Sequence, residues 1–325
     1  MKWMHLPPEH TLGKILCHNI ADAQGHKALH KGARVGEKEL AQLRALGLRE
    51  VTVAALEPGD VHEDEAAERL TRACAGDGVA LSEASGGRAN LLAARAGVLK
   101  VNADALFEVN RIEGLTIATL PRDRVVAARR MVATIKIIPF AVPERELARA
   151  EAIGVAHGGL IAVRAMPPAQ VGVLLTGGEP ARERVLKSFA PAIRSRIEEL
   201  GSAALEVVYA PHQSEAIAGA LLRLRAAGAA LIVIAGETSI MDREDVTPRG
   251  IAQAGGRIEH YGAPVEPGNL LLLAYLDDAL PVIGAPGCVR SRDLNVVDLI
   301  LPRLLAGERL TRADIAQLGD GGLLL

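Results

Sequence analysis

The chain has 325 residues, of which 49% are hydrophobic, 23% charged and 2% aromatic, and its formal net charge is −2. That length suits two ordinary domains, and no apolar run approaches the roughly 20 residues that span a bilayer, so we expect no membrane segment. The near-neutral charge and the scarcity of aromatic rings argue against a nucleic-acid partner, because backbone phosphates attract a basic excess and unpaired bases stack on rings.

The N-terminus and the cysteines favour a cytoplasmic location. Residues 1–8 contain neither an apolar segment nor the small-residue cleavage site of a secretory signal. Cys17, Cys74 and Cys288 are odd in number and lack C-x-x-C spacing, which argues against a disulfide framework and against a zinc site. These features fit a reducing compartment.

The first half of the chain shows a mixed α/β pattern. Apolar periodicity predicts helices at 37–46, 63–74 and 104–111, and strands at 51–53, 98–101, 116–118 and 132–138. The last of these strands stops at Pro139, and residues 139–149 are rich in proline and charge, as domain boundaries often are. We predict a mixed α/β domain over residues 1–155 and a second α/β domain over residues 156–325.

The second half is more regular, because strands and helices alternate with short links. We predict strands at 171–175, 205–209 and 231–235, and helices at 180–200 and from Ser214 to just before Gly228. A helix at 246–254, strands at 257–262, 270–275 and 281–283, and a helix at 292–305 follow. This alternation is typical of a doubly wound, mostly parallel sheet with helices on both faces.

Three loops follow strands of that sheet, at the edge where open α/β folds bind ligands. The first is Thr176-Gly177-Gly178-Glu179. Its glycines let a ligand approach the backbone, and the free N–H groups at the start of the next helix favour an anion. The alternative interpretation is an ordinary turn between strand and helix, since short glycine motifs are common.

The second loop is Gly236-Glu237-Thr238-Ser239, and Asp242 and Asp245 follow it closely. Hydroxyls at this edge suit a polar, phosphate-bearing ligand. Two carboxylates could also hold Mg²⁺, which prefers oxygen ligands shared with substrate phosphates. Alternatively, Asp242 and Asp245 only cap the next helix, where its dipole favours negative charge.

The third loop runs from Pro286 and Gly287 to Ser291, before the last helix. Arg290 could pair with a phosphate, although surface arginines are usually just solvated. Cys288 is a possible nucleophile, but no histidine lies near it in sequence to act as its base. A small loop residue is the preferred interpretation of this thiol.

With these loops in place, residues 165–305 resemble the molybdopterin-binding fold of molybdenum-cofactor biosynthesis proteins. That family surrounds the pterin phosphate with a T-G-D/G-E loop, a G-G-x-S loop followed by Asp, a P-G element and a final P-G-x-P element. The matching segments here are Thr176 to Glu179, Gly236 to Ser239 with Asp242 and Asp245, Pro267-Gly268, and Pro286-Gly287.

The first half resembles, more faintly, the lead-in domain of molybdopterin molybdotransferases. The segments that carry this likeness are Lys31-Gly32, residues 43–53, Pro58-Gly59-Asp60 and residues 77–80. As a whole, the chain looks closest to divergent molybdopterin-binding proteins that also occur fused to a nucleotidyltransferase.

The chain departs from the family pattern at several loop positions. Glu237 stands where the second glycine of G-G-x-S is usual, and Val289 replaces the second proline of P-G-x-P. The usual glycine after the serine is replaced around Ile240-Met241, and Gly178 stands where molybdotransferases often have Asp. Glu237 adds negative charge where an anionic ligand should sit, so these changes favour ligand binding over metal-insertion chemistry.

The resemblance implies a protein that binds the phosphate of molybdopterin, or of its adenylyl or cytidylyl nucleotide, with Mg²⁺ as a further candidate ligand. Glu179, Asp242 and Asp245 would be the catalytic candidates, and the last two would hold the metal. The binding residues would be Thr176, Gly177, Gly178, Gly236, Glu237, Thr238, Ser239, Pro267, Gly268, Pro286, Gly287, Arg290 and Ser291.

Two alternatives to this binding function stay open. The chain could be a catalytic molybdotransferase that inserts molybdate into adenylylated molybdopterin, or a non-catalytic scaffold that delivers cofactor to a molybdoenzyme. The resemblance also implies a homodimer, with a molybdoenzyme or another cofactor-biosynthesis protein as a possible partner.

Overall fold

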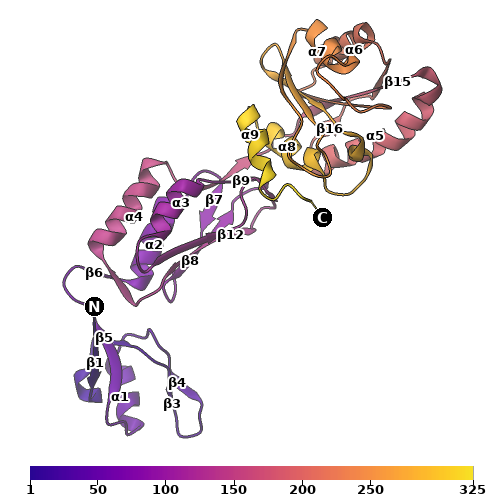
Figure 1. The fold of residues 1–325 in the computed structure, drawn as a ribbon. Helices are drawn as coiled ribbons and strands as arrows, with labels where there is room; N and C mark the ends of the chain where they lie inside the picture. Colours follow the sequence, from indigo (N-terminus) through magenta and orange to yellow (C-terminus); the bar gives the residue numbers. More distant parts are fainter. Residues whose placement is uncertain (325) are drawn as a thin grey trace. The chain divides into compact units, whose positions relative to one another are not determined.

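The computed structural model describes residues 1–324, which form two compact units that divide between Arg164 and Ala165 (Figure 1). Leu325, the last residue of the expected second domain, lies outside the described residues. The division falls a little after the expected 155/156 boundary, because α4 packs on α2 and strand β14 pairs with β9, both in the first unit. Among residues 1–324, no helix is long and apolar enough to cross a membrane.

The first unit begins with a small sheet in the order β1-β5-β2 and a separate β3-β4 hairpin. Helix α1 contributes Leu40 and Leu43 to the core of this part, opposite Val51 and Val53 of β5. The elements are β1 (Lys2–Leu6), η1 (Pro8–His10), β2 (Ile15–Leu16), β3 (Ile20–Ala21), β4 (Lys27–Leu29), α1 (Glu37–Ala45) and β5 (Val51–Ala55).

The rest of the first unit is built on a four-stranded antiparallel sheet in the order β10-β12-β8-β7. Leu70 of α2 and Leu147 of α4 share a core with Leu91 and Ile135 of that sheet. The elements are β6 (Asp60–His62), α2 (Glu63–Cys74), β7 (Val79–Leu81), β8 (Arg88–Ala93), β9 (Gly97–Val101), α3 (Ala103–Asn110), β10 (Leu115–Thr119), β11 (Val125–Val126), β12 (Met131–Ile137), β13 (Ala141–Pro143), α4 (Glu144–Ala156) and β14 (Ile161–Ala165).

A seven-stranded, mostly parallel sheet forms the second unit, in the order β16-β15-β18-β21-β20-β19, with β17 also paired to β15. Among these strands, β20 alone runs opposite to the rest, because it pairs antiparallel with both β21 and β19. The strands are β15 (Gln170–Gly177), β16 (Ala203–Ala204), β17 (Val208–Pro211), β18 (Leu231–Gly236), β19 (Gly256–Tyr261), β20 (Leu272–Leu276) and β21 (Leu280–Gly284). The doubly wound α/β architecture predicted from the sequence is confirmed.

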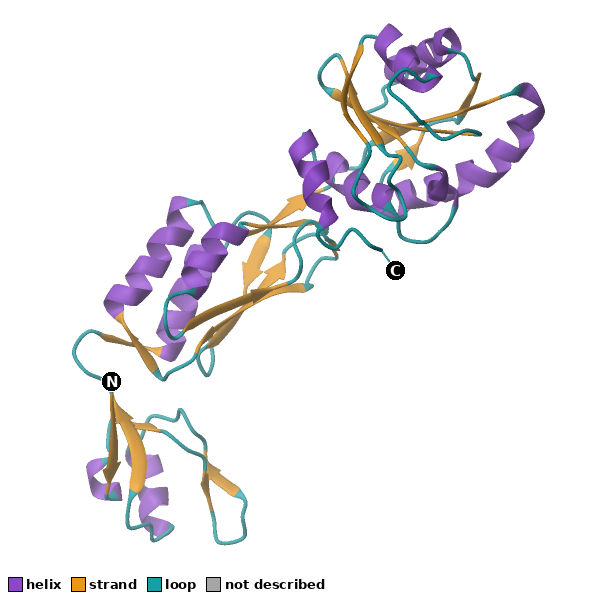
Figure 2. Cartoon of the chain, viewed as in Figure 1, coloured by secondary structure: helices purple, strands orange, loops and turns teal. Residues whose placement is uncertain are grey.

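Helices cover both faces of this sheet (Figure 2). Apolar residues at helical spacing, among them Val185, Phe189 and Ile193 of α5, pack with α8 on one face, while α6 and α7 pack on the other. The helical elements are η2 (Glu179–Ala181), α5 (Arg182–Glu199), α6 (Ser214–Ala226), α7 (Val246–Gln253), η3 (Gly287–Arg290), α8 (Val296–Leu305), α9 (Arg312–Ala316) and η4 (Gln317–Gly319).

Two elements of the second unit differ from the sequence prediction. The strand predicted at 205–209 overlaps only β17, while residues 205–207 link it to β16, and both strands pair with β15. The helix predicted at 292–305 begins only at Val296, because Asn295 caps it: the Asn295 side chain accepts from the N–H of Val297, and Asp298 accepts from the N–H of Asn295. The residues just before Asn295 therefore form a loop.

Strand register places the loops of interest at one edge of the sheet. Gly177 of β15 lies beside Pro211 of β17, Thr176 lies beside Gly236 of β18, and Ile234 of β18 lies beside Gly284 of β21. These neighbours are parallel strands, so their carboxyl ends come out together. Each of the three loops identified in the sequence starts at this edge.

Candidate functional site

The first two strand-end loops meet closely enough that glycine is needed at their contacts. A Cβ atom on Gly236 would lie 2.7 Å from the Thr176 carbonyl oxygen, and one on Gly177 would lie 3.0 Å from Cβ of Glu237. A Cβ atom on Gly287 would lie 3.5 Å from Ser239 Oγ, at ordinary contact distance. The first loop thus packs against the second, and the second adjoins the third.

The first loop contains a buried hydroxyl without a hydrogen bond. Thr176 is 1% exposed, and its Oγ1 has no partner among the described residues. Both backbone polar groups of Gly178 are hydrogen-bonded to side chains. Its N–H donates to Glu237 Oε2 at 3.1 Å, and its carbonyl accepts from the Tyr209 hydroxyl at 2.8 Å. Glu179 is exposed and pairs with Arg182 at 3.5 Å. The glycine loop is therefore fixed by side chains from neighbouring strand ends.

The Glu237 carboxylate is bound by two donors. Besides accepting from Gly178, its carboxylate accepts from Arg184 of α5 through Oε1 at 2.6 Å. Burial, together with the carboxylates of Glu237 and Glu179, raises the pKa of the Tyr209 hydroxyl, so this group stays a protonated donor at neutral pH. Sequence reasoning did not find Tyr209 or Arg184.

The second loop faces a histidine that the sequence prediction also missed. His212 follows β17, and its Nε2 lies 3.5 Å from Thr238 Oγ1 and 3.9 Å from Asp245 Oδ1. The other ring nitrogen, Nδ1, is buried and has no partner in the part of the chain that the structure describes. Its position in the sequence could have indicated it, because His212 stands between a predicted strand and the helix that starts at Ser214, where such loops reach the ligand-binding edge of the sheet.

Asp245 and Asp242 serve first as hydrogen-bond acceptors for the local backbone. Asp245 is the N-cap of α7: Oδ1 accepts from the N–H of Val246 at 2.6 Å, and Oδ2 accepts from the N–H of Met241 at 3.1 Å. Asp242 is exposed and accepts from the N–H of Glu244 at 2.8 Å. Asp245 therefore caps α7, as the capping interpretation predicts.

These carboxylates do not fit a magnesium site of their own. Over residues 1–324, no group of three or more His, Cys, Asp or Glu side chains gathers where a metal ion could be held. Mg²⁺ also demands near-octahedral oxygen ligands. Asp245 has both carboxylate oxygens already bonded to backbone N–H groups.

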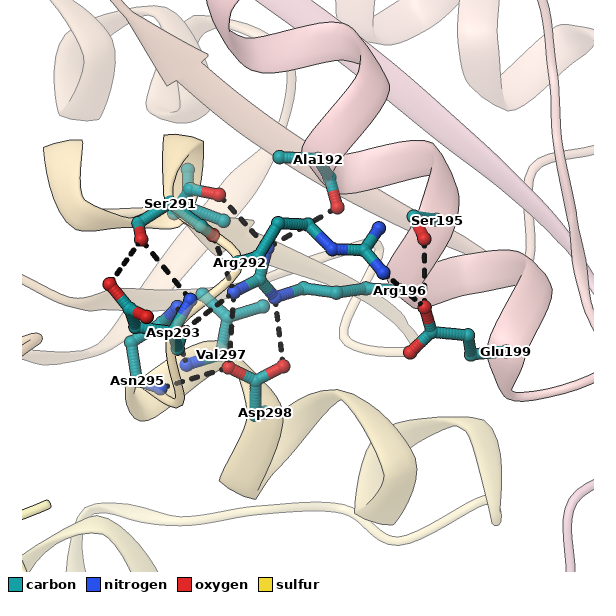
Figure 3. Close-up of polar contacts among 11 residues, drawn as sticks. Ala192, Ser195, Arg196, Glu199, Ser291, Arg292, Asp293, Asn295, Val297 and Asp298 are labelled. Carbon is teal, nitrogen blue, oxygen red and sulfur yellow. Dashed lines mark hydrogen bonds and ion pairs between the residues drawn. The ribbon is translucent and has the colours of Figure 1, made fainter.

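The third loop is anchored by Arg196, a residue of α5 that is 7% exposed (Figure 3). Its Nε donates to Asp298 Oδ1 at 2.8 Å. Its remaining donors reach carbonyl groups along the loop: Nη1 donates to Val289 at 3.0 Å, and Nη2 to Ser291 at 2.8 Å and to Asp293 at 3.0 Å. One guanidinium thus joins α5, the third loop and the start of α8.

The candidate residues of the third loop differ in how free they are to bind a ligand. The Ser291 hydroxyl donates to Asp293 Oδ2 at 2.6 Å, so it is already engaged within the loop. Arg290 is exposed, whereas its neighbour Arg292 pairs with Glu199 at 2.8 Å. Burial raises the pKa of the Cys288 thiol, which keeps it protonated and favours the interpretation as a small loop residue over a nucleophile.

Pro267 and Gly268 support α8 rather than the first two loops. The Pro267 carbonyl accepts from the N–H of Val296 at 3.2 Å. Gly268 has φ +135°, and a Cβ atom there would lie 2.5 Å from Val296 Cγ1, so only glycine fits. The structure thus brings the three loops to one sheet edge, whereas Pro267 and Gly268 pack against the start of α8.

The sequence was also compared with models of known protein families. Residues 172–306 match the family model "Probable molybdopterin binding domain". This segment of the chain is thus similar to that family. The matched range begins in β15 and ends just after α8, so the molybdopterin-binding domain includes all three loops and the Arg196 anchor. Residues 5–55 match a second model, described as "Domain of unknown function (DUF8806)".

Several solved structures are similar to the chain at low sequence identity. A molybdenum cofactor biosynthesis protein from Pyrococcus furiosus is 12% identical, with a TM-score of 0.26, and the match covers 97% of this chain and 65% of that one. The molybdopterin biosynthesis moeA protein from Pyrococcus horikoshii is 11% identical, with a TM-score of 0.28 and coverages of 97% and 75%. The molybdopterin biosynthesis enzyme MoaB from Thermus thermophilus is 20% identical, with a TM-score of 0.33 and coverages of 43% and 98%.

This chain therefore spans less than two thirds of the length of the Pyrococcus furiosus protein. A search of curated proteins found no match.

We predict that Arg196→Met lowers the free energy of unfolding of the molybdopterin-binding domain by about 3–5 kcal/mol, because it strands a carboxylate and several carbonyls. Denaturant unfolding measures this. All three tyrosines, Tyr209, Tyr261 and Tyr275, lie in the second unit, so tyrosine fluorescence follows that unit, whereas the single tryptophan, Trp3, belongs to the first.

Arg194→Met is the matched control for the Arg196 variant. Arg194 is an exposed arginine of the same helix, and its replacement removes the same charge without touching the third loop. Equal destabilisation by the two substitutions would contradict the anchoring role of Arg196.

Proposed function

We propose that the molybdopterin-binding domain binds the phosphate end of molybdopterin, or of a molybdopterin nucleotide, at the three strand-end loops, as a step of molybdenum cofactor biosynthesis. The observation that carries this proposal is that residues 172–306 match the family and that their loops meet at one sheet edge. The ligand would lie across the carboxyl ends of β15, β17, β18 and β21, where open α/β sheets bind ligands.

Two polar atoms at this edge support a polar ligand. Thr176 Oγ1 and His212 Nδ1 are both buried without a partner, although buried polar atoms are usually hydrogen-bonded. They belong to the ends of adjacent paired strands, since Gly177 lies beside Pro211. Oxygen atoms of a bound phosphate, or waters that accompany it, would supply the missing hydrogen bonds. Exposed Arg290 would add positive charge from the third loop.

We predict that Thr176→Val weakens molybdopterin binding while stabilising the free protein. The substitution removes an unpartnered buried hydroxyl, so the free energy of unfolding should rise by about 1–3 kcal/mol, and the affinity should fall roughly tenfold because a ligand hydrogen bond is lost. Calorimetric titration with purified molybdopterin measures the affinity, and wild-type protein that shows no saturable binding would refute the proposed function.

Thr71→Val is the matched control for this experiment. Thr71 Oγ1 is another buried, unpartnered hydroxyl, but it belongs to α2 of the first unit. Its removal should stabilise the protein without changing molybdopterin affinity. If both valine variants bound like the wild type, Thr176 would have no part in the ligand site.

A catalytic molybdotransferase is the second candidate function, and the grouping of Asp245, His212 and Thr238 favours it. A carboxylate and an imidazole near a hydroxyl can move a proton during cleavage of a phosphoanhydride. Asp242, whose carbonyl accepts from the N–H of Asp245 at 3.3 Å, and Glu179 are the further catalytic candidates. Such an enzyme would insert molybdate into adenylylated molybdopterin.

Asp245→Asn separates the catalytic role of this residue from its capping role. Asparagine keeps one acceptor oxygen for the N–H of Val246, so the α7 cap should persist while the charge and the hydrogen bond to Met241 are lost. If Asp245 acts in catalysis, the rate of molybdate insertion should fall by a factor of about 10² or more. Asp242→Asn serves as the comparison, and an Asp245→Asn protein with the wild-type rate would remove Asp245 from the mechanism.

A further inference from the structure

A side chain of the protein itself already binds two donors of the first loop. Glu237 Oε2 accepts from the N–H of Gly178 at 3.1 Å, and Oε1 accepts from Arg184 at 2.6 Å. A backbone N–H in a glycine loop and an arginine are donors that phosphate oxygens also take. The donors that suit a ligand phosphate are therefore occupied in the free protein.

We propose that Glu237 is an internal anion that competes with phosphate for Gly178 and Arg184, and so sets which ligands the site accepts. The inference rests on the proposed function for its physiological ligand, because that function puts a phosphate at these loops. A phosphate monoester must displace the Glu237 carboxylate to reach both donors. Every such ligand meets this cost, and a ligand bound through phosphate contacts alone has no further contacts to offset it.

The Glu237 carboxylate is placed so that it can leave. The side chains of Glu237 and Arg184 are 32% and 68% exposed, so their ion pair is screened by solvent and weak. The backbone of Glu237, in contrast, is fixed, because its N–H donates to the Thr176 carbonyl at 2.9 Å. Displacement consequently needs a rotation of one side chain and no movement of the loop.

Two basic side chains, Arg184 and Lys187, lie where an incoming phosphate would bind. Arg184 also lines a hollow of 470 Å³ at the start of α5, together with Pro180, Glu183, Lys187 and Ser188. When Glu237 turns away, Arg184 loses its partner carboxylate and presents a free guanidinium, with Lys187 one helical turn further on. The same arginine thus serves the internal anion in one state and the ligand in the other.

Inorganic phosphate is the simplest probe of this competition. We expect Glu237→Gln to bind phosphate about tenfold more tightly than the wild type, because the charge is lost. Glu237→Ala should bind more tightly still, because alanine also frees the Gly178 N–H. Calorimetry at constant ionic strength measures these affinities. Adding Arg184→Met to the Glu237→Ala protein should reverse most of the gain, since the freed arginine is then absent.

Glu183→Gln is the control for general electrostatics. Glu183 is exposed, adjoins Arg184 in sequence and lines the same hollow, so its replacement removes the same charge without freeing Gly178. An equal gain for Glu183→Gln, or no gain for either Glu237 variant, would overturn the proposal. In the wild type, saturating phosphate should also shift the Gly178 amide resonance, and an unmoved resonance would overturn it too.

Parallel titrations with molybdopterin keep this proposal separate from the proposed function. If phosphate affinity rises as expected but molybdopterin binds to no variant, the internal anion stands and the proposed function fails. If molybdopterin binds to the wild type but phosphate affinity is the same in all variants, the proposed function stands and the internal anion fails.

Discussion

The arrangement of the site depends on one buried guanidinium. Arg196 joins its own helix α5 to two segments far along the chain, the carbonyl groups of the third loop and Asp298 at the start of α8. A buried charge is tolerated only when its hydrogen bonds are satisfied, so the loop must keep the conformation that presents those carbonyls. That conformation puts Gly287 beside Ser239 and completes the edge at which the three loops meet.

Most charged and hydroxyl groups at this edge are already satisfied by the protein. Glu237 binds Gly178 and Arg184, Asp245 caps α7, and the Ser291 hydroxyl donates to Asp293. Thr176 and His212, in contrast, each keep a buried polar atom without a partner. A ligand therefore gains most where the protein has left hydrogen bonds unmade, and it must compete where the protein has made its own. The glycine-loop motif alone suggests an open phosphate site. The hydrogen bonds already made within the protein limit which ligands can bind there.

The sequence predicted much of the fold, because the relevant signals are local. Apolar runs with short links identified the alternating strands and helices of the second unit, and helical periodicity gave α2 at Glu63–Cys74 as the structure has it. The pairing order of the first unit's sheet, β10-β12-β8-β7, could not be read in this way, since it depends on contacts between distant segments. The same limit applies to the site. Arg196 and Asp298 are 102 positions apart, and Arg184 and Glu237 are 53 apart, so no local pattern links them.

We propose that a pterin phosphate binds at the three loops held together by Arg196. Hydrogen exchange with and without saturating molybdopterin tests this binding site, because each loop carries backbone N–H groups that a ligand would protect. Exchange should slow in peptides that contain residues 176–179, 236–239 and 286–291, with little change in the first unit. Saturable binding that leaves these three segments unprotected, and slows exchange elsewhere instead, would contradict it.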